Sequence, residues 1–241
     1  MKKITIIIPA YNESLYVKKL LEKVISVPTE SVGYNKEIIF IDDGSTDDTV
    51  SLAKQFDFVN VFTQENKGKG AAVKHGISKA TGDLILIQDA DLEYDPFDYL
   101  PMLEEIGDSD NVSVYGSRIK GVIKSSGHKT FFLGKHPDQG YGAWIANLII
   151  TFTTFILYGK FITDMLTAYK LYPATIMKKI DIKTSGFETD HEISAKLMKN
   201  GVKIKEVPIS YIPRSKDDGK KIRAIDGIKA LITLLKFRIL N

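Results

Sequence analysis

Short apolar runs alternate with stretches of helical spacing through the first half of the chain, and no other feature constrains the fold as strongly. The strand-like runs cover residues 4–8, 37–41, 60–62, 84–87 and 112–115. The helical stretches between them cover residues 13–27, 47–56, 69–80 and 96–106. This alternation predicts an α/β fold with a mostly parallel, twisted sheet and helices on both faces.

Polar side chains gather where four of these strands end. The clusters are residues 9–13, 42–47, 89–93 and 116–118. Sheets of this kind bind their ligands at the carboxyl ends of the strands. Four clusters on one predicted edge therefore indicate a binding site there.

Asp89 and Asp91 stand one residue apart, directly after the apolar strand at 84–87. Carboxylates crowded at a strand end repel each other and lose solvation, which costs free energy unless a cation compensates. Mg²⁺ and Mn²⁺ prefer oxygen ligands, and usually take one or two carboxylates together with substrate phosphates. The pair therefore predicts a metal–diphosphate site. The alternative is a polar strand exit with solvated acids.

Asp42 and Asp43 follow the strand at 37–41 and precede Ser45 and Thr46. Either hydroxyl can cap the next helix, which explains part of the motif. Capping does not explain two adjacent acids at a sheet edge. A carboxylate there can accept hydrogen bonds from a nucleoside base or from ribose hydroxyls, so the motif favours nucleotide binding.

Residues 66–70, Asn-Lys-Gly-Lys-Gly, precede a helix expected to start near Ala71 and suit an anion cradle. They fit neither common phosphate loop. The chain has no Gly-Lys-Ser or Gly-Lys-Thr tripeptide, and its first strand runs into Pro-Ala-Tyr-Asn-Glu instead of a glycine fingerprint. Both absences argue against a P-loop ATPase and an NAD enzyme.

The pattern changes after residue 118. Residues 120–141 are rich in Gly, Lys, Ser and His and predict a long loop. Residues 143–158 are apolar and uncharged, and predict a helix that is either buried or interfacial. Its length, about 24 Å, is short for a membrane span. Strands are expected at 167–172 and 202–207, with a helix at 188–199.

The charge is uneven along the chain. Its net value is +3, yet residues 214–241 carry +5 and the rest −2. This asymmetry predicts an anionic partner for the C-terminal end, with a membrane surface as a candidate. The absence of cysteine excludes disulfides and thiolate metal sites and fits a reducing compartment. The four histidines are scattered without metal-ligand spacing, and the N-terminus does not resemble a signal peptide.

Six motifs occur in an order that resembles family 2 glycosyltransferases of the GT-A fold, in the branch of the dolichyl-phosphate mannose synthases and glucosyltransferases. The likeness runs from residue 4 to about residue 235. The motifs are residues 8–13 (Ile-Pro-Ala-Tyr-Asn-Glu), 42–45 (Asp-Asp-Gly-Ser), 66–70, 89–91 (Asp-Ala-Asp), 116–118 (Gly-Ser-Arg) and 206–209 (Glu-Val-Pro-Ile).

The resemblance implies roles for individual residues. It implies Mg²⁺ or Mn²⁺ bound by Asp89, Asp91 and Glu93, with a carboxylate at 93 where mannose synthases often carry Gln. Asp91, Arg118 and Asp190 are implied in catalysis. The positions implied to bind a GDP- or UDP-hexose are Pro9, Tyr11, Glu13, Ile41, Asp43, Asp89, Ala90, Asp91, Arg118 and Arg214.

The implied reaction is an inverting, metal-dependent transfer of a hexose to a polyprenyl or dolichyl phosphate. Such an acceptor is already an anion and needs no base. The alternative is a hydroxyl acceptor in cell-surface glycan synthesis, with Asp190 as the base. A third hypothesis is a non-catalytic subunit that binds sugar nucleotides. The sequence at 186–192 departs from that of many relatives, which affects the acceptor more than the donor.

These considerations predict a catalytic domain at 1–214 and a basic amphipathic helix at 215–241. The domain would include an acceptor loop and apolar interface helix at 119–160. In the C-terminal segment, apolar residues recur at helical spacing, flanked by Lys229, Lys236 and Arg238. The expected place is the cytoplasmic face of a membrane, without a transmembrane tail. The expected partners are a sugar nucleotide and a lipid phosphate, with no nucleic acid; a homo-oligomer is compatible. Alternatively, the helix packs on the domain.

Overall fold

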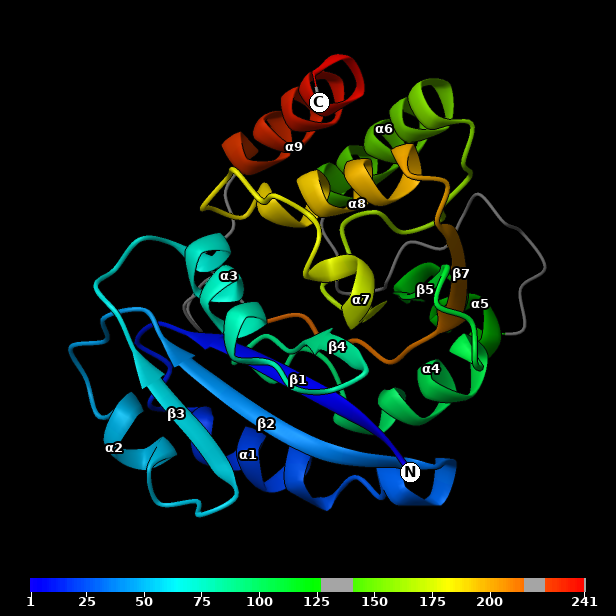
Figure 1. Ribbon diagram of the computed structural model, residues 1–241. Helices are drawn as coiled ribbons and strands as arrows, with labels where there is room; N and C mark the ends of the chain where they lie inside the picture. Colours follow the sequence, from blue (N-terminus) through cyan, green and yellow to red (C-terminus); the bar gives the residue numbers. More distant parts are fainter. Residues whose placement is uncertain (127–140, 215–223, 241) are drawn as a thin grey trace.

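The computed structural model describes residues 1–126, 141–214 and 224–240. These residues form one seven-stranded sheet with helices packed against it (Figure 1). The strands lie in the order β3-β2-β1-β4-β6-β5-β7. They are β1 (Lys2–Ala10), β2 (Tyr34–Asp42), β3 (Val59–Thr63), β4 (Leu84–Ile87), β5 (Val112–Ser117), β6 (Lys170–Pro173) and β7 (Lys203–Pro208).

Strand β6 is antiparallel to its neighbours β4 and β5, whereas the other neighbouring strands pair in parallel. All seven predicted strands are present, and the prediction of a mostly parallel sheet is confirmed. On β1, Ile6 pairs with Ile38 of β2 on one side and with Leu86 of β4 on the other. This register aligns the carboxyl ends of the three strands that carry the acidic motifs.

Helices cover both faces of the sheet (Figure 1). The α-helices are α1 (Val17–Ser26), α2 (Thr49–Ala53), α3 (Lys69–Lys79), α4 (Tyr99–Ile106), α5 (Arg118–Ser126), α6 (Tyr141–Tyr158), α7 (Ala174–Met177), α8 (Thr189–Lys199) and α9 (Ala224–Ile239). Two 3₁₀ helices, η1 (Thr29–Val32) and η2 (Pro96–Asp98), complete the described elements.

Successive side chains of β1 point to opposite faces of the sheet, so the core consists of two layers. Ile4, Ile6 and Ile8 pack with the apolar faces of α1 and α4. Ile7 packs on the opposite face, among buried residues of α3 and α8. Both faces are therefore covered, as the apolar strands require.

The expected loop at 120–141 is wrong in its first part, because α5 extends to residue 126; residues 127–140 lie outside the described part of the chain. Gly121 of α5 allows the helix to approach the extended segment after β7, since a Cβ there would overlap the carbonyl oxygen of Ile209. A glycine in this place serves close packing and does not break the helix.

The apolar helix predicted at 143–158 is confirmed as α6, which packs against α9. The hydroxyl of Tyr158 in α6 donates to the carbonyl of Leu234 in α9 at 2.7 Å. Within the described ranges, no helix has the length and apolar character needed to cross a membrane.

Candidate active site

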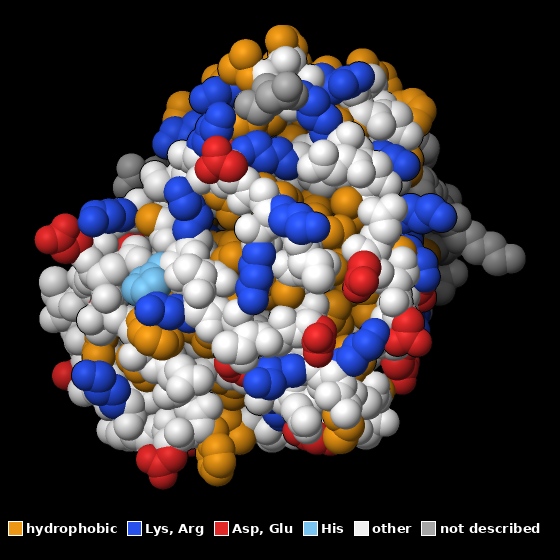
Figure 2. Space-filling model, viewed as in Figure 1, with side chains coloured by type: hydrophobic (Ala, Val, Ile, Leu, Met, Phe, Trp, Pro, Cys, Tyr) orange, Lys and Arg blue, Asp and Glu red, His pale blue; other side chains and the backbone are white. Residues whose placement is uncertain are grey.

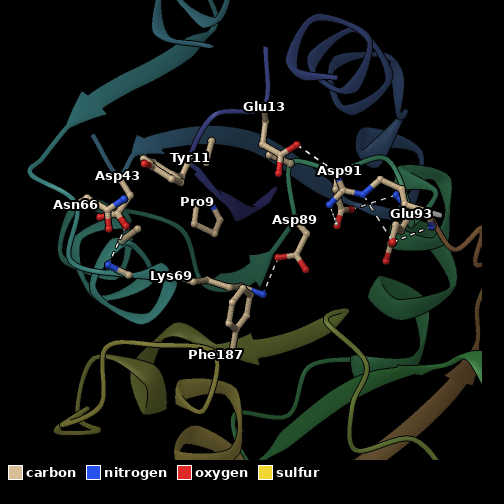
Figure 3. A pocket seen from close by; sticks show the side chains of 15 residues that line it. Pro9, Tyr11, Glu13, Asp43, Asn66, Lys69, Asp89, Asp91, Glu93 and Phe187 are labelled. Carbon is tan, nitrogen blue, oxygen red and sulfur yellow. Dashed lines mark hydrogen bonds and ion pairs between the residues drawn. The ribbon is translucent and has the colours of Figure 1, made fainter. Parts of the chain in front are cut away.

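The acidic motifs line one cavity of about 280 Å³ at the carboxyl ends of β1, β2 and β4 (Figure 3). Segments far apart in the sequence meet around it. The side chains include Pro9, Tyr11 and Glu13 after β1, Asp43 after β2, Asn66 and Lys69 before and within α3, Asp89, Ala90, Asp91 and Glu93 after β4, Phe187 before α8, and Arg214.

Asp43 anchors the loop that leads into α3. Its carboxylate accepts hydrogen bonds from the backbone amides of Lys67 and Gly68 at 3.0 and 2.8 Å, and from the Gln64 amide at 2.7 Å. Gly68 has a φ of +95°, and a Cβ there would clash with the carbonyl oxygen of Ser185. The Gly-Lys-Gly motif therefore serves a tight turn that delivers Lys69 into the cavity.

Lys69 lies between two carboxylates. Its ammonium is 2.6 Å from an oxygen of Asp89 and 3.6 Å from one of Asp190, and its side chain is largely buried. Burial alone would lower the pKa of this lysine, but the two carboxylates raise it above its ordinary value. Lys69 is therefore a fixed positive charge beside the Asp89-Ala90-Asp91 motif.

Arg214 brings a second cation to the other side of the motif. Its guanidinium lies 3.0 Å from Asp91 and 3.3 Å from Glu13, and its backbone amide donates to Glu93 at 2.9 Å. Burial, together with the charges of Asp89 and Glu93, raises the pKa of Asp91 to about 7, although Arg214 opposes the shift. This edge of the sheet therefore holds more negative charge than Arg214 alone balances.

The backbone between the acids is unusual. Leu92 has a φ of +59°, a backbone conformation that residues other than glycine rarely adopt. The turn sends Glu93 toward the C-terminal segment, where its carboxylate accepts from Tyr211 at 2.9 Å and from the Arg214 amide. Glu93 thus fixes Tyr211 and Arg214 in place.

The acids fit a divalent cation only in part. Among the residues that the structure describes, no three acids or histidines converge as a metal cage. All three acids line the cavity, but the Glu93 carboxylate accepts hydrogen bonds from the Tyr211 hydroxyl and the Arg214 amide. Two carboxylates with diphosphate oxygens match a common Mg²⁺ arrangement, so the geometry suits Asp89 and Asp91 and does not support a contribution from Glu93.

Three of the predicted site residues lie outside the cavity lining. Ile41 is buried in the core. Asp190 reaches the site through its ion pair with Lys69. Arg118 is held by Asp164, which accepts from its side-chain nitrogens twice at 2.8 Å and from its backbone amide at 3.0 Å. The donor contacts of Ile41 and Arg118 stay predictions.

Arg118 instead borders a second cavity, of about 520 Å³, between α5 and the segment after β7. Lys124, Ser125 and Tyr211 also line it. The Arg118 guanidinium lies 4.9 Å from the centre of the Tyr211 ring, and Tyr211 donates to Glu93 of the first cavity. Tyr211 therefore connects the lining of the second cavity with that of the first.

Comparisons with known proteins agree with this architecture. A family model described as glycosyl transferase family 2 matches residues 5–163. A Methanococcus voltae protein named UDP-N-acetylglucosamine–dolichyl-phosphate N-acetylglucosaminyltransferase is 27% identical, and the match covers 98% of this chain and 96% of that protein. The undecaprenyl-phosphate 4-deoxy-4-formamido-L-arabinose transferase of Salmonella paratyphi B is 28% identical, over 98% of this chain and 68% of that protein.

The fold also matches a solved structure. Glucosyl-3-phosphoglycerate synthase from Mycobacterium tuberculosis, in complex with Mn²⁺, uridine-diphosphate-glucose and phosphoglyceric acid, superposes with a TM-score of 0.71. The match covers 100% of this chain and 81% of that protein at 15% identity. At this identity the likeness concerns the fold, which is the GT-A fold that the motifs predicted.

Proposed function

The chain belongs to glycosyl transferase family 2, and on that premise we propose that it transfers a hexose from a UDP-sugar to a polyprenyl phosphate, with inversion at the anomeric carbon. The observation that carries the proposal is the placement of Lys69 and Arg214 on either side of Asp89 and Asp91 in one cavity. Cations and paired acids in this arrangement suit a diphosphate leaving group.

The choice of uridine rests on a relative. The Methanococcus voltae protein is named for a UDP-sugar, and it matches this chain over almost its whole length. Tyr11, Asp43 and Asn66 line the part of the cavity beside β2 and the 66–70 loop, which suits a nucleoside base (Figure 3). Transfer from GDP-sugars is the competing possibility for the donor.

Asp89 and Asp91 would hold a Mg²⁺ or Mn²⁺ ion together with the donor's diphosphate. A bound divalent cation supplies Lewis-acid stabilisation of the negative charge that develops on the departing nucleoside diphosphate. Lys69 and Arg214 add two fixed positive charges at the same place. Asp89 and Asp91 also hold the side chains of Lys69 and Arg214 in place before the donor binds, which limits reorganisation of these charges during transfer.

The environment of Asp190 supports a phosphate acceptor over a hydroxyl acceptor. Burial would raise the pKa of this carboxyl group, but Lys69 and the buried Lys170 lower it below its ordinary value. A carboxylate stabilised in this way is a weak base at neutral pH. A polyprenyl phosphate needs no deprotonation, because its oxygen is already an anion.

The second cavity offers a place for the acceptor phosphate. Lys124 and Ser125 line it, and Arg118 contributes a guanidinium whose charge is partly balanced by Asp164. Its lining residue Tyr211 donates a hydrogen bond to Glu93, which lines the donor cavity. A phosphate bound there would approach the donor from the side of β5 and α5.

The test compares donors and acceptors directly. Thermal shift with UDP- and GDP-sugars in the presence of Mn²⁺ identifies the donor, and UDP-sugars are expected to stabilise the protein. Transfer is then measured to a polyprenyl phosphate and to the matched polyprenol, which lacks the phosphate. Product with the phosphate alone is expected. Transfer to the alcohol would contradict the proposal. Binding without hydrolysis or transfer would indicate a non-catalytic subunit.

A further inference from the structure

We propose that Gln64 and His75 are positioning residues that set the specificity for the nucleoside base, because they leave the Asp43 carboxylate a single position for accepting a hydrogen bond from the donor. This inference rests on the proposed function, which gives uridine as the base. It goes further by naming the residues of the chain that distinguish uracil from guanine. Both residues act through Asp43, and neither belongs to the residues that line the donor cavity.

The carboxylate of Asp43 already accepts hydrogen bonds from three donors of the chain. Its oxygen Oδ1 accepts from the side-chain amide of Gln64 at 2.7 Å and from the backbone amide of Lys67 at 3.0 Å. The other oxygen, Oδ2, accepts from the backbone amide of Gly68 at 2.8 Å. A carboxylate has about four positions for accepting hydrogen bonds, two on each oxygen. One position on Oδ2 therefore has no donor among the described residues, and Asp43 lines the donor cavity.

These bonds determine the orientation of the Gln64 amide and the position of a hydrogen on His75. Both oxygens of Asp43 accept from N–H groups, so Gln64 must turn its NH₂ group toward Asp43 and its oxygen away from it. That oxygen, Oε1, lies 3.0 Å from Nδ1 of His75. Because an amide oxygen can only accept, Nδ1 of the ring must carry a hydrogen. His75 therefore holds Gln64 against Asp43.

Secondary structure fixes both residues in turn. His75 lies in α3, and its ring packs against that of Phe62 in β3, with the ring centres 5.8 Å apart. The ring is partly buried, and its exposed part lies at the surface beside α3 (Figure 2). Gln64 follows β3, and its backbone amide donates to the carbonyl of Asp42 at the end of β2 at 3.0 Å. The path from His75 through Gln64 to Asp43 is therefore held by α3, β3 and β2.

The two candidate bases differ in the donors that they offer to a carboxylate. Uracil has one ring N–H between two carbonyl groups, whereas guanine has a ring N–H beside an amino group. A carboxylate can pair with both guanine donors only if each oxygen has a free position, and both positions on Oδ1 of Asp43 are taken. One guanine donor would therefore lose water without gaining a partner, whereas the uracil N–H needs only the position on Oδ2. Asn66 lines the same cavity, and its amide can donate to a uracil carbonyl (Figure 3).

The experiment measures the affinities of the full chain for UDP and for GDP by isothermal titration calorimetry, with Mn²⁺ and without sugar or acceptor. Gln64→Leu frees one position on Oδ1 of Asp43, and His75→Leu removes the group that holds Gln64. His75→Asn is the conservative variant, because its amide can place an N–H close to that of Nδ1. The matched control is Gln55→Leu, at an exposed position after α2. Circular dichroism checks that each variant is folded.

We expect the wild type and the control to bind UDP at least about tenfold more tightly than GDP, since one guanine donor is left unpaired. This ratio should fall at least about threefold in Gln64→Leu and in His75→Leu, and His75→Asn should restore it.

A preference for UDP that is unchanged in both leucine variants would overturn the inference and leave the choice of uridine intact. So would a ratio in His75→Asn as low as that in His75→Leu, because the loss would then not depend on the N–H group. A wild type that prefers GDP would overturn the choice of uridine and this inference together. The assay contains neither sugar nor acceptor, so failure of the proposed transfer leaves its result unaffected.

Discussion

The ammonium of Lys69 lies 2.6 Å from the carboxylate of Asp89, so the chain itself supplies a cation to the motif expected to bind a metal–diphosphate complex. Phe187 covers this lysine, with its ring centre 5.9 Å from the ammonium. The ion pair is largely shielded from water, which strengthens it. A diphosphate entering the cavity would therefore meet a preorganised positive charge.

Replacing Lys69 by Met is expected to reduce transfer by at least about tenfold, because Asp89 loses its counter-ion and the donor loses a positive charge. Steady-state kinetics with varied donor would measure the loss. Lys67→Met is the matched control, since this lysine is 64% exposed and pairs only weakly with Glu65 at 3.5 Å. Equal activity of the two variants would contradict a role for the Lys69 charge.

Asp91→Asn is expected to abolish transfer, through the loss of at least about 3 kcal/mol of transition-state stabilisation, or roughly two orders of magnitude in rate. The fold should persist, because the substitution removes a carboxylate that Asp89 and Glu93 destabilise. Circular dichroism and transfer assays on the same preparation measure both effects. Asp110→Asn, at an exposed position beyond the other end of the sheet, is the control. Near-normal turnover, or full activity in excess EDTA, would refute the metal assignment.

The alternation of short apolar runs and helical stretches was enough to predict the sheet and the edge at which the site lies. Period-2 and period-3.6 patterns are local, so the sequence displays them directly. The same local patterns predicted that Asp43, Asp89 and Asp91 lie at one edge of the sheet, where they line one cavity; their roles in binding stay predictions. These residues directly follow strands whose register aligns their ends.

Long-range pairing could not be predicted in this way. Asp164 follows no strand or recognisable motif, yet it fixes Arg118 from 46 positions away along the chain. Arg214 reaches Asp91 across 123 positions, through a segment held beside Tyr94 by an isolated bridge from Tyr211. The motif at 66–70 predicts an anion cradle that includes Lys69, but the position of this lysine between Asp89 and Asp190 depends on the packing of α3 against α8. Such contacts follow from tertiary packing alone.

The Arg118–Asp164 pair predicts a stability effect that must be separated from any catalytic one. The side chain of Asp164 is 1% exposed, so removing its partner leaves a buried charge. Arg118→Met is expected to destabilise the fold by about 3 kcal/mol, or to lower Tm by roughly 6–12 °C. Thermal unfolding of Arg118→Met, Asp164→Asn and the double variant measures the coupling. Additive effects would show that the pair contributes little.

Lys124→Ala tests the second cavity without disturbing that pair. If the acceptor phosphate binds beside Arg118, this variant should raise the KM for polyprenyl phosphate several-fold, through loss of a charge-assisted contact, and leave the KM for the donor unchanged. Lys205→Ala is a suitable control, because that lysine pairs with Glu105 at the surface. A change in the KM for the donor alone would show that Lys124 does not contribute to acceptor binding.

Asp190→Asn distinguishes the two acceptor classes. With a phosphate acceptor the chemical step should stay within about tenfold of the wild type, because no proton is removed from the nucleophile. The structure adds a reason, since Asp190 is 3.6 Å from Lys69 and its pKa is held below the ordinary value. Single-turnover rates measured across pH would separate the chemical step from binding. A collapse of the rate, together with a pH profile that flattens in the variant, would identify Asp190 as a base and favour a hydroxyl acceptor.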